Sequence, residues 1–358
     1  MKYKNLAFKI LEKAEKEHLN LYHDISKQEV LEFIDSIDWN NINDTSFDKQ
    51  MLKLFALFKD AHTLYWGKWE YLDNNPIYIE DKLYILHNGK YRKIKKIGSI
   101  SSEDFIKEIS TMCCYETVEY LKDTIRSVIK NGYYYRMLGL EENNTIVLTL
   151  ENREKCCVNL ISKTEAIEKG SLQALPNYEF KVIDENVLYF IYRKCMQHKD
   201  YTFSTFMEEL KQEIKSKNIT KYILDLRGNH GGDSEILNPF QDLVKEQNLK
   251  GVLLIDNGTF SSGRFAVSRF KNEFNTPLIG EGTGGASKSY GWNKNLEVEG
   301  KKFCVSTHLW DFSWIFGYTG SIQPDIYVEK TLKDIETKED SQLNTAIEII
   351  KKEEKIID

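Results

Sequence analysis

Three apolar, strand-like runs in the C-terminal half of this 358-residue chain each end in a loop rich in Gly, Ser and Asn. The loops are DLRGNHGG at 225–232, DNGTFSSG at 256–263 and GEGTGG at 280–285. Amphipathic, helix-like stretches separate the runs, and this alternation predicts a layered α/β core. Because ligands of open α/β sheets bind at the carboxyl ends of strands, we expect the chemistry of the chain in these loops.

The patterns along the chain predict three parts. Residues 1–70 carry apolar residues every three or four positions, which indicates an N-terminal helical region. Residues 71–170 mix short β runs with one amphipathic stretch and predict a small α+β module. Residues 171–358 form the α/β core and end in an amphipathic helix from 340, and we place the main boundary near 165–177.

Composition excludes two classes of partner. The chain has 49 Lys plus Arg against 55 Asp plus Glu, a net charge of -6, so no positive field is available to hold nucleic acid. No window approaches the roughly 18 consecutive apolar residues of a membrane span. The N-terminus mixes Lys and Glu among its apolar residues and lacks the features of a signal peptide, so a cytoplasmic location is expected as written, or export if a leader was removed.

The sequence gives no sign of a metal or organic cofactor. Its six cysteines include two adjacent pairs but no CxxC spacing, and we expect buried thiols rather than zinc ligands or disulfides. HExxH and P-loop motifs are absent. Gly280, Gly282 and Gly285 satisfy GxGxxG, but the residues that follow alternate instead of showing helical periodicity, so a dinucleotide site is not favoured.

Ser261 and the glycine loop could supply nucleophilic chemistry. Ser261 follows a strand and a turn and precedes an amphipathic segment, so its hydroxyl would stand at a helix N-terminus. Gly231 and Gly232 allow backbone N–H groups to face a ligand, as an oxyanion hole requires. Each feature alone is also compatible with a plain N-cap or a plain turn. Thr259 stands where the GxSxG motif of α/β-hydrolases needs glycine.

A nucleophilic serine needs a base, and histidine is the usual one. Met51, Phe55 and Phe58 form an apolar helix face whose next member is His62, which predicts His62 at a helix end and facing inward. A satisfied core histidine is the alternative at this position. His230 lies inside the glycine loop. The remaining histidines are interpreted as structural: His18, His23, His87, His198 and His308.

Five motifs in this order resemble the C-terminal-processing, or tail-specific, serine peptidase family. They are DAHT at 60–63, DLRGNHGG, TFSSG, GEGTGG and SIQPDIYV at 321–328. The resemblance is strong over 178–330 and includes DAHT, which is similar to the tricorn-like and retinoid-binding-protein-like branch that uses a histidine. It implies a crotonase-like (ClpP/crotonase type) α/β core and a degenerate PDZ-like insertion in the middle module.

The resemblance also implies roles for individual residues. Ser261 matches the family's nucleophile, and the N–H groups of Gly231, Gly232 and Ser262 would form the oxyanion hole. His62 would be the general base.

Several positions depart from the family pattern. The lysine of the Ser–Lys branch is Ala286 here, with Lys288 two residues further on. Tyr318 replaces the glutamate that precedes the PD motif, and Arg264 replaces an acidic residue after the nucleophile. The third catalytic member is therefore open. Its candidates are Asp60, Glu281 and Asp311.

The expected function is that of a serine peptidase. His62 would deprotonate Ser261, which would attack a peptide carbonyl and form an acyl-enzyme that water releases. The substrates would be extended peptides or unfolded and C-terminal protein segments, guided by strand addition to the middle module. The alternative is a catalytically inactive relative that binds a peptide or an apolar small ligand on the same scaffold.

Overall fold

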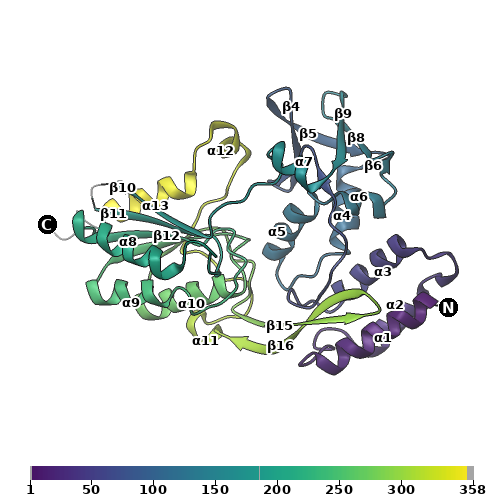
Figure 1. Cartoon of the computed structure of the whole chain (residues 1–358), viewed down its shortest axis with the longest axis horizontal. Coiled ribbons are helices and arrows are strands. Elements are labelled where there is room, and N and C mark those ends of the chain that lie inside the picture. Colours follow the sequence, from purple (N-terminus) through teal and green to yellow (C-terminus); the bar gives the residue numbers. More distant parts are fainter. Residues whose placement is uncertain (1, 185, 353–358) are drawn as a thin grey trace. The chain divides into compact units, whose positions relative to one another are not determined.

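The computed structural model describes residues 2–184 and 186–352, which belong to two compact units (Figure 1). The first unit comprises Met1–Gln173 and Ser289–Trp310, and the second comprises Ala174–Lys288 and Asp311–Asp358. The segment 289–310, expected in the α/β core, belongs instead to the first unit, because Leu64 and Tyr65 pair with Cys304 and Phe303. The division into parts at 1–70, 71–170 and 171–358 stays a prediction.

A six-stranded sheet forms the centre of the second unit, in the order β10-β11-β12-β13-β14-β17. Strand β10 is antiparallel to β11, and the other pairs are parallel. Its strands are β10 (Tyr178–Asp184), β11 (Val187–Tyr192), β12 (Lys221–Asp225), β13 (Lys250–Ile255), β14 (Leu278–Gly280) and β17 (Ile326–Tyr327). Its helices are α8 (Phe203–Ser216), α9 (Asn238–Gln247), α10 (Ser262–Phe274), α11 (Ser313–Phe316), α12 (Leu332–Thr337) and α13 (Ser341–Lys352).

Alternate residues of the central strands enter two separate apolar cores. Leu224 and its equivalents pack with the aromatic side chains of α8, α9 and α10, such as Phe206, Phe240 and Phe270. Ile223 and its equivalents face the opposite side and pack against Ala346 and Ile350 of α13 (Figure 1). Apolar residues on both faces of a parallel sheet require helices on both sides. The layered α/β prediction is therefore confirmed for this unit.

The first unit combines helices with two sheets. Its elements are α1 (Lys2–Glu17), α2 (Lys27–Ser36), the 3-10 helix Trp39–Asn41, α3 (Asp44–Ala56), β1 (Leu64–Tyr65), β2 (Tyr71–Leu72), β3 (Ile77–Ile79), β4 (Lys82–His87), β5 (Lys90–Ile97), β6 (Ile100–Ser101), α4 (Ser102–Ser110), α5 (Val118–Val128), α6 (Gly132–Met137), β7 (Glu141–Glu142), β8 (Thr145–Leu150), β9 (Lys155–Ile161), α7 (Lys163–Glu168), β15 (Lys288–Val298) and β16 (Lys301–Asp311). Strands β1, β16 and β15 form one sheet, and the order β2-β9-β8-β5-β4-β3 defines the other.

The burial of the cysteines differs from the sequence expectation at one position, Cys157. All six cysteines are free; Cys157 is exposed and the other five are buried. Among the described residues, no helix is both long and apolar enough to cross a membrane.

The parallel register brings the three glycine-rich loops to one edge of the sheet in the second unit. Asp225 pairs with Leu254, and Ile255 pairs with Gly280, so neighbouring strands end at nearly the same level. Hydrogen bonds join the loops directly: the Phe260 N–H donates to the Asn229 carbonyl at 2.9 Å, and the Gly285 N–H donates to the Thr259 carbonyl at 3.2 Å. The carboxyl edge of the sheet is thus a connected platform.

Arg227 ties this platform to the C-terminal helix. Its guanidinium donates to the Asp225 carboxylate at 2.6 and 2.9 Å and to both oxygens of Asp340 at 2.8 Å. It also donates to the Gln342 side chain at 2.9 Å. Asp225 is buried and the Arg227 side chain is only 16% exposed, so the ion pairs are shielded from solvent. The arginine of the DLRG sequence therefore has a structural task.

The Arg227→Ala variant should lose about 3 kcal/mol of unfolding free energy, because it leaves the buried Asp225 carboxylate without its counter-ion. Urea unfolding followed by circular dichroism measures this loss. Lys211→Ala, an exposed change on α8, is the control and should change stability by less than about 0.5 kcal/mol. Equal stabilities of the two variants would contradict the anchoring role.

Candidate active site

Ser261 occupies a strained turn between β13 and α10. Its backbone has φ 50° and ψ -122°, a region that residues other than glycine rarely adopt. It is the residue before α10, but its side chain makes no capping hydrogen bond to that helix. The simple N-cap interpretation therefore does not describe Ser261. The hydroxyl is half-buried and stands at the N-terminus of α10, where the helix dipole favours negative charge.

The glycine loop packs so closely against the start of α10 that there is no room for a side chain between them. A Cβ on Gly231 would lie 2.6 Å from the Ser262 nitrogen and 2.7 Å from the Ser261 Cβ. A Cβ on Gly232 would lie 2.2 Å from the Cys195 carbonyl oxygen. Both glycines also have positive φ, 94° and 133°. Their identity is thus required by contact and by backbone conformation together.

The three expected oxyanion donors differ in their hydrogen bonds. The Gly231 N–H donates to Asn229 Oδ1 at 2.9 Å and is therefore already engaged. Over residues 2–184 and 186–352, the backbone N–H groups of Gly232 and Ser262 have no hydrogen-bond acceptor. The Ser262 hydroxyl donates to the Gly232 carbonyl at 2.6 Å and fixes the two residues to each other. Gly232 and Ser262 are consequently the pair whose N–H groups are available to a ligand.

His62 belongs to the first unit and lies in a turn, not at a helix end as its apolar spacing predicted. Helix α3 ends at Ala56, and Lys59 has φ 52°, a left-handed conformation that prevents the helix from continuing. His62 follows in the turn before β1 and is 6% exposed, so the inward orientation is right although the helix is not. The Gly291 backbone faces the imidazole: a Cβ there would lie 3.7 Å from His62 Cε1.

Asp60 anchors the turn that carries His62. Its carboxylate accepts the His62 backbone N–H at 2.8 Å, the Thr63 hydroxyl at 2.6 Å and the His18 ring at 2.9 Å. The Asn20 N–H donates to Nδ1 of His18, so Nε2 of that ring carries the proton given to Asp60. Burial alone would raise the pKa of Asp60, but the His18 hydrogen bond and the charge of His62 lower it to about 2. Asp60 is therefore ionised throughout the physiological pH range.

Glu116 is a third ionisable group beside Asp60 and His62, and no sequence motif points to it. Ligand-type atoms of Asp60, His62 and Glu116 all lie within 4.8 Å of one another. Glu116 is half-buried and precedes Thr117, the N-cap of α5. It stands in the ordinary-looking sequence CCYETVEY, more than fifty residues after His62. Only the packing of the folded unit brings it to the imidazole.

The other candidates for the third catalytic residue lie in the second unit. Glu281 is buried directly after β14. Asp311 is exposed, and its hydrogen bonds with Ser313 and Lys288 lower its pKa to about 2. Lys288 lies 3.0 Å from Asp311 in an ion pair. Both Glu281 and Asp311 are thus in a different unit from His62.

Arg264, one of the departures from the family pattern, is a core residue of the second unit. It is 1% exposed, and its Nη1 donates to the Ala286 carbonyl. The guanidinium lies 5.3 Å from the centres of the Phe265 and Phe312 rings. Its charge is therefore enclosed by a carbonyl and two aromatic rings at the first turn of α10.

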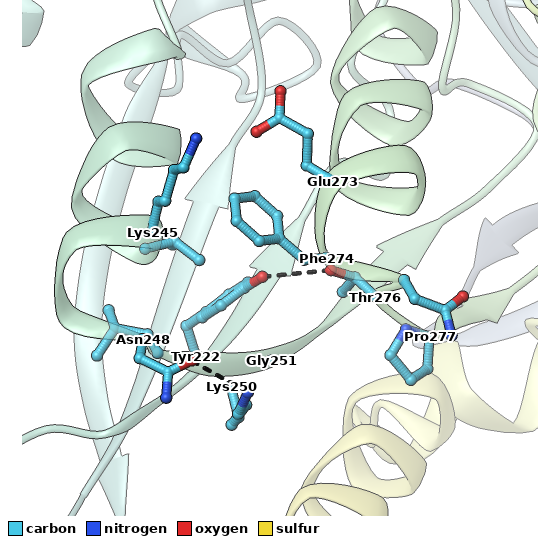
Figure 2. A pocket seen from close by; sticks show the side chains of 12 residues that line it. Tyr222, Lys245, Asn248, Lys250, Gly251, Glu273, Phe274, Thr276 and Pro277 are labelled. Atoms are coloured by element: carbon cyan, nitrogen blue, oxygen red, sulfur yellow. Dashed lines mark hydrogen bonds between the residues drawn. The ribbon is translucent and has the colours of Figure 1, made fainter. Parts of the chain in front are cut away.

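A cavity of about 690 Å³ in the second unit lies at the opposite edge of the sheet (Figure 2). It opens among the amino ends of the strands, where the Tyr222 ring covers Gly251 and the Tyr222 hydroxyl shares a 3.5 Å hydrogen bond with the Thr276 hydroxyl. Lys245 and Glu273 extend from α9 and α10 at its rim (Figure 2). None of its lining residues belongs to the glycine-rich loops, so it is separate from Ser261.

Asp60→Asn should lower the unfolding free energy by about 2 kcal/mol at pH 7, since the pKa of Asp60 is depressed in the folded state. A carboxyl group whose pKa is lowered by folding stabilises the folded state at pH values above its pKa in the unfolded chain, near 4. This contribution is lost as the pH falls toward 2. The difference between wild type and variant in urea titrations should therefore shrink between pH 5 and pH 2. Exposed Asp24→Asn is the control, and a difference that does not depend on pH would contradict the anchor.

Comparison with known sequences finds no family model and no curated protein that matches the chain. Solved structures do match. Mature CPAF in complex with lactacystin is 11% identical, with a TM-score of 0.66 over 94% of this chain and 95% of that chain. Mature CPAF alone is also 11% identical, with a TM-score of 0.64 over 94% of both chains.

A photosystem II D1 C-terminal processing protease is 10% identical, with a TM-score of 0.50 over 92% of this chain and 94% of that one. Likeness at such identities concerns the fold, and it extends over nearly the whole chain in each case. The expectation drawn from the motifs is thereby confirmed at that level: this chain has the fold of the tail-specific, C-terminal processing peptidases.

Proposed function

We propose that this chain is a serine peptidase in which Ser261 is the nucleophile and His62 the general base. The observation that carries the proposal is the conformation of Ser261. A strained, uncapped serine at a helix N-terminus stands beside two available backbone N–H groups, those of Gly232 and Ser262. A structural serine needs neither the strain nor the donors, whereas acyl transfer uses both.

The reaction follows from these groups. His62 takes the proton of Ser261, and the Ser261 oxygen attacks the peptide carbonyl. The oxyanion that forms accepts hydrogen bonds from Gly232 and Ser262 and is further stabilised by the N-terminus of α10. His62 then gives its proton to the leaving amine. In the second half, His62 takes a proton from a water molecule, the hydroxide attacks the acyl carbonyl, and the proton passes to the Ser261 oxygen as the ester bond breaks. No metal or organic cofactor is needed.

The availability of Gly232 and Ser262 refines the oxyanion assignment within this proposal. The Gly231 N–H holds the Asn229 side chain, so Gly231 contributes by its close approach to Ser261 rather than by donating. Each remaining donor is expected to be worth about 10²- to 10³-fold in rate.

The substrates proposed are extended peptides and unfolded or C-terminal segments of proteins. The sheet of residues 71–170 ends in strand β3 on one side and β2 on the other, and an exposed strand edge can accept a peptide as an added strand. We assign that segment as a degenerate PDZ-like module and the second unit as a crotonase-like core. The fold shared with processing proteases supports these assignments.

A fluorophosphonate should add once to the wild-type chain, and intact-protein mass spectrometry should show the adduct. Ser261→Ala should abolish it, because the phosphonyl group bonds to the attacking oxygen. His62→Ala should slow its formation by at least about 10³-fold, since the serine then lacks its base. Hydrolysis of a labelled unfolded casein should fall in parallel.

Ser262→Ala is the matched control for the nucleophile, because it removes a neighbouring hydroxyl and its bond to the Gly232 carbonyl but keeps the backbone N–H. It should keep the adduct. An adduct lost only in Ser262→Ala would move the nucleophile by one residue. A wild-type chain that forms no adduct and cleaves no casein would contradict the peptidase proposal and favour a binding protein on the same scaffold.

A further inference from the structure

His62 faces two carboxylates in the first unit, and they differ in what they already bind. Atoms of Asp60, Glu116 and the imidazole lie within 4.8 Å of one another. A general base gains from a neighbouring carboxylate that orients its ring and stabilises the imidazolium. The question is which of the two carboxylates has that task.

Asp60 is committed to the backbone of the turn. Oδ1 accepts the His62 N–H, and Oδ2 accepts both the Thr63 hydroxyl and the His18 ring. The carboxylate is 1% exposed, so no solvent can rearrange around it. Three donors on two oxygens leave little acceptor capacity for the imidazole of His62. Asp60 thus fixes where His62 is, not how its ring is turned.

Glu116 approaches the same ring from a different segment. It belongs to the stretch between α4 and α5 and is half-buried, so its carboxylate can reach the imidazole while one side stays near solvent. A separation within 4.8 Å suits a direct hydrogen bond after a small side-chain rotation, or one bridging water.

Other ionisable groups around the ring do not compete for this task. Burial raises the pKa of Cys114 and that of Cys304, so both thiols stay neutral. The Lys59 ammonium donates to the Tyr115 hydroxyl at 2.9 Å and lies over that ring. His18 donates its proton to Asp60.

We infer that Glu116 is the positioning residue of the proposed peptidase: it orients the imidazole of His62 and stabilises the positive charge that His62 gains from Ser261. This inference rests on the proposed function. It places the acidic member before α5, in the first unit, whereas the candidates from the sequence were Asp60, Glu281 and Asp311. It also accounts for Tyr318 at the position where the family pattern carries glutamate.

A divalent metal ion held by the same three residues is the competing explanation of the cluster. Such an ion would have to share the Asp60 carboxylate with the three protein donors that it already accepts. The positioning role needs no such rearrangement. Metal analysis of the purified chain separates the two.

The test uses the full-length Glu116→Gln variant, with Glu119→Gln on α5 as the matched control. Nuclear magnetic resonance titration of the ring protons, assigned with His62→Ala, should show a drop of about one unit in the pKa of His62 in Glu116→Gln only. For peptide hydrolysis, kcat should fall at least about 10-fold with KM nearly unchanged, and the acid limb of the pH profile should move to lower pH. Glu116→Asp should restore part of both.

An unchanged pKa of His62 in Glu116→Gln would overturn the inference even if His62→Ala is inactive, and the proposed function would then stand without it. Reaction of Ser261 with fluorophosphonate at the wild-type rate in His62→Ala would instead remove the proposed base. About one equivalent of zinc in the wild-type chain, lost in Glu116→Gln, would also overturn the positioning role in favour of a metal site.

Discussion

The contact between the Gly231 backbone and the first residues of α10 is the constraint on which the second unit depends. The glycine loop and the serine turn approach so closely that a Cβ on Gly231 would lie 2.6 Å from the Ser262 nitrogen and 2.7 Å from the Ser261 Cβ. The Ser262 hydroxyl and the Asn229 side chain then lock the two segments through Gly232 and Gly231. What remains available is a hydroxyl in a strained turn beside two N–H groups, and the proposed acyl transfer rests on this arrangement.

The first unit solves a different problem, which is to hold a histidine in place outside a helix. A buried carboxylate with its pKa lowered to about 2 does this by accepting bonds from three groups around the turn. Desolvation opposes that ionisation, so the donors have to outweigh it. In the proposed arrangement, Asp60 fixes the backbone of the turn and Glu116 orients the imidazole ring. Two carboxylates thus share what a single acid would otherwise do alone.

Local patterns predicted much of this molecule. The strands at 178–184, 187–192, 221–225 and 250–255 and the helices that follow them arise from apolar periodicity and glycine positions, which can be read from the residues themselves. The inward position of His62 was right, but its helix was not, because the left-handed Lys59 ends that helix early. The spacing of apolar residues does not reveal that one residue, Lys59, has a left-handed backbone conformation.

Long-range packing explains what the sequence could not predict. The segment 289–310 joins the first unit through pairing between β1 and β16, which are more than two hundred residues apart. Glu116 lies in a stretch with no motif, and it becomes a candidate only because the fold brings it close to Asp60 and His62. The difference between Gly231 and Gly232 likewise depends on where the Asn229 side chain lies.

The crystal structure of the fluorophosphonate adduct would test the central claim most directly. We predict the phosphonyl oxygen about 2.7–3.1 Å from the Gly232 and Ser262 nitrogens, with the His62 ring at hydrogen-bond distance from the Ser261 oxygen; an oxygen bound away from both nitrogens, or a His62 ring turned to other partners, would contradict it.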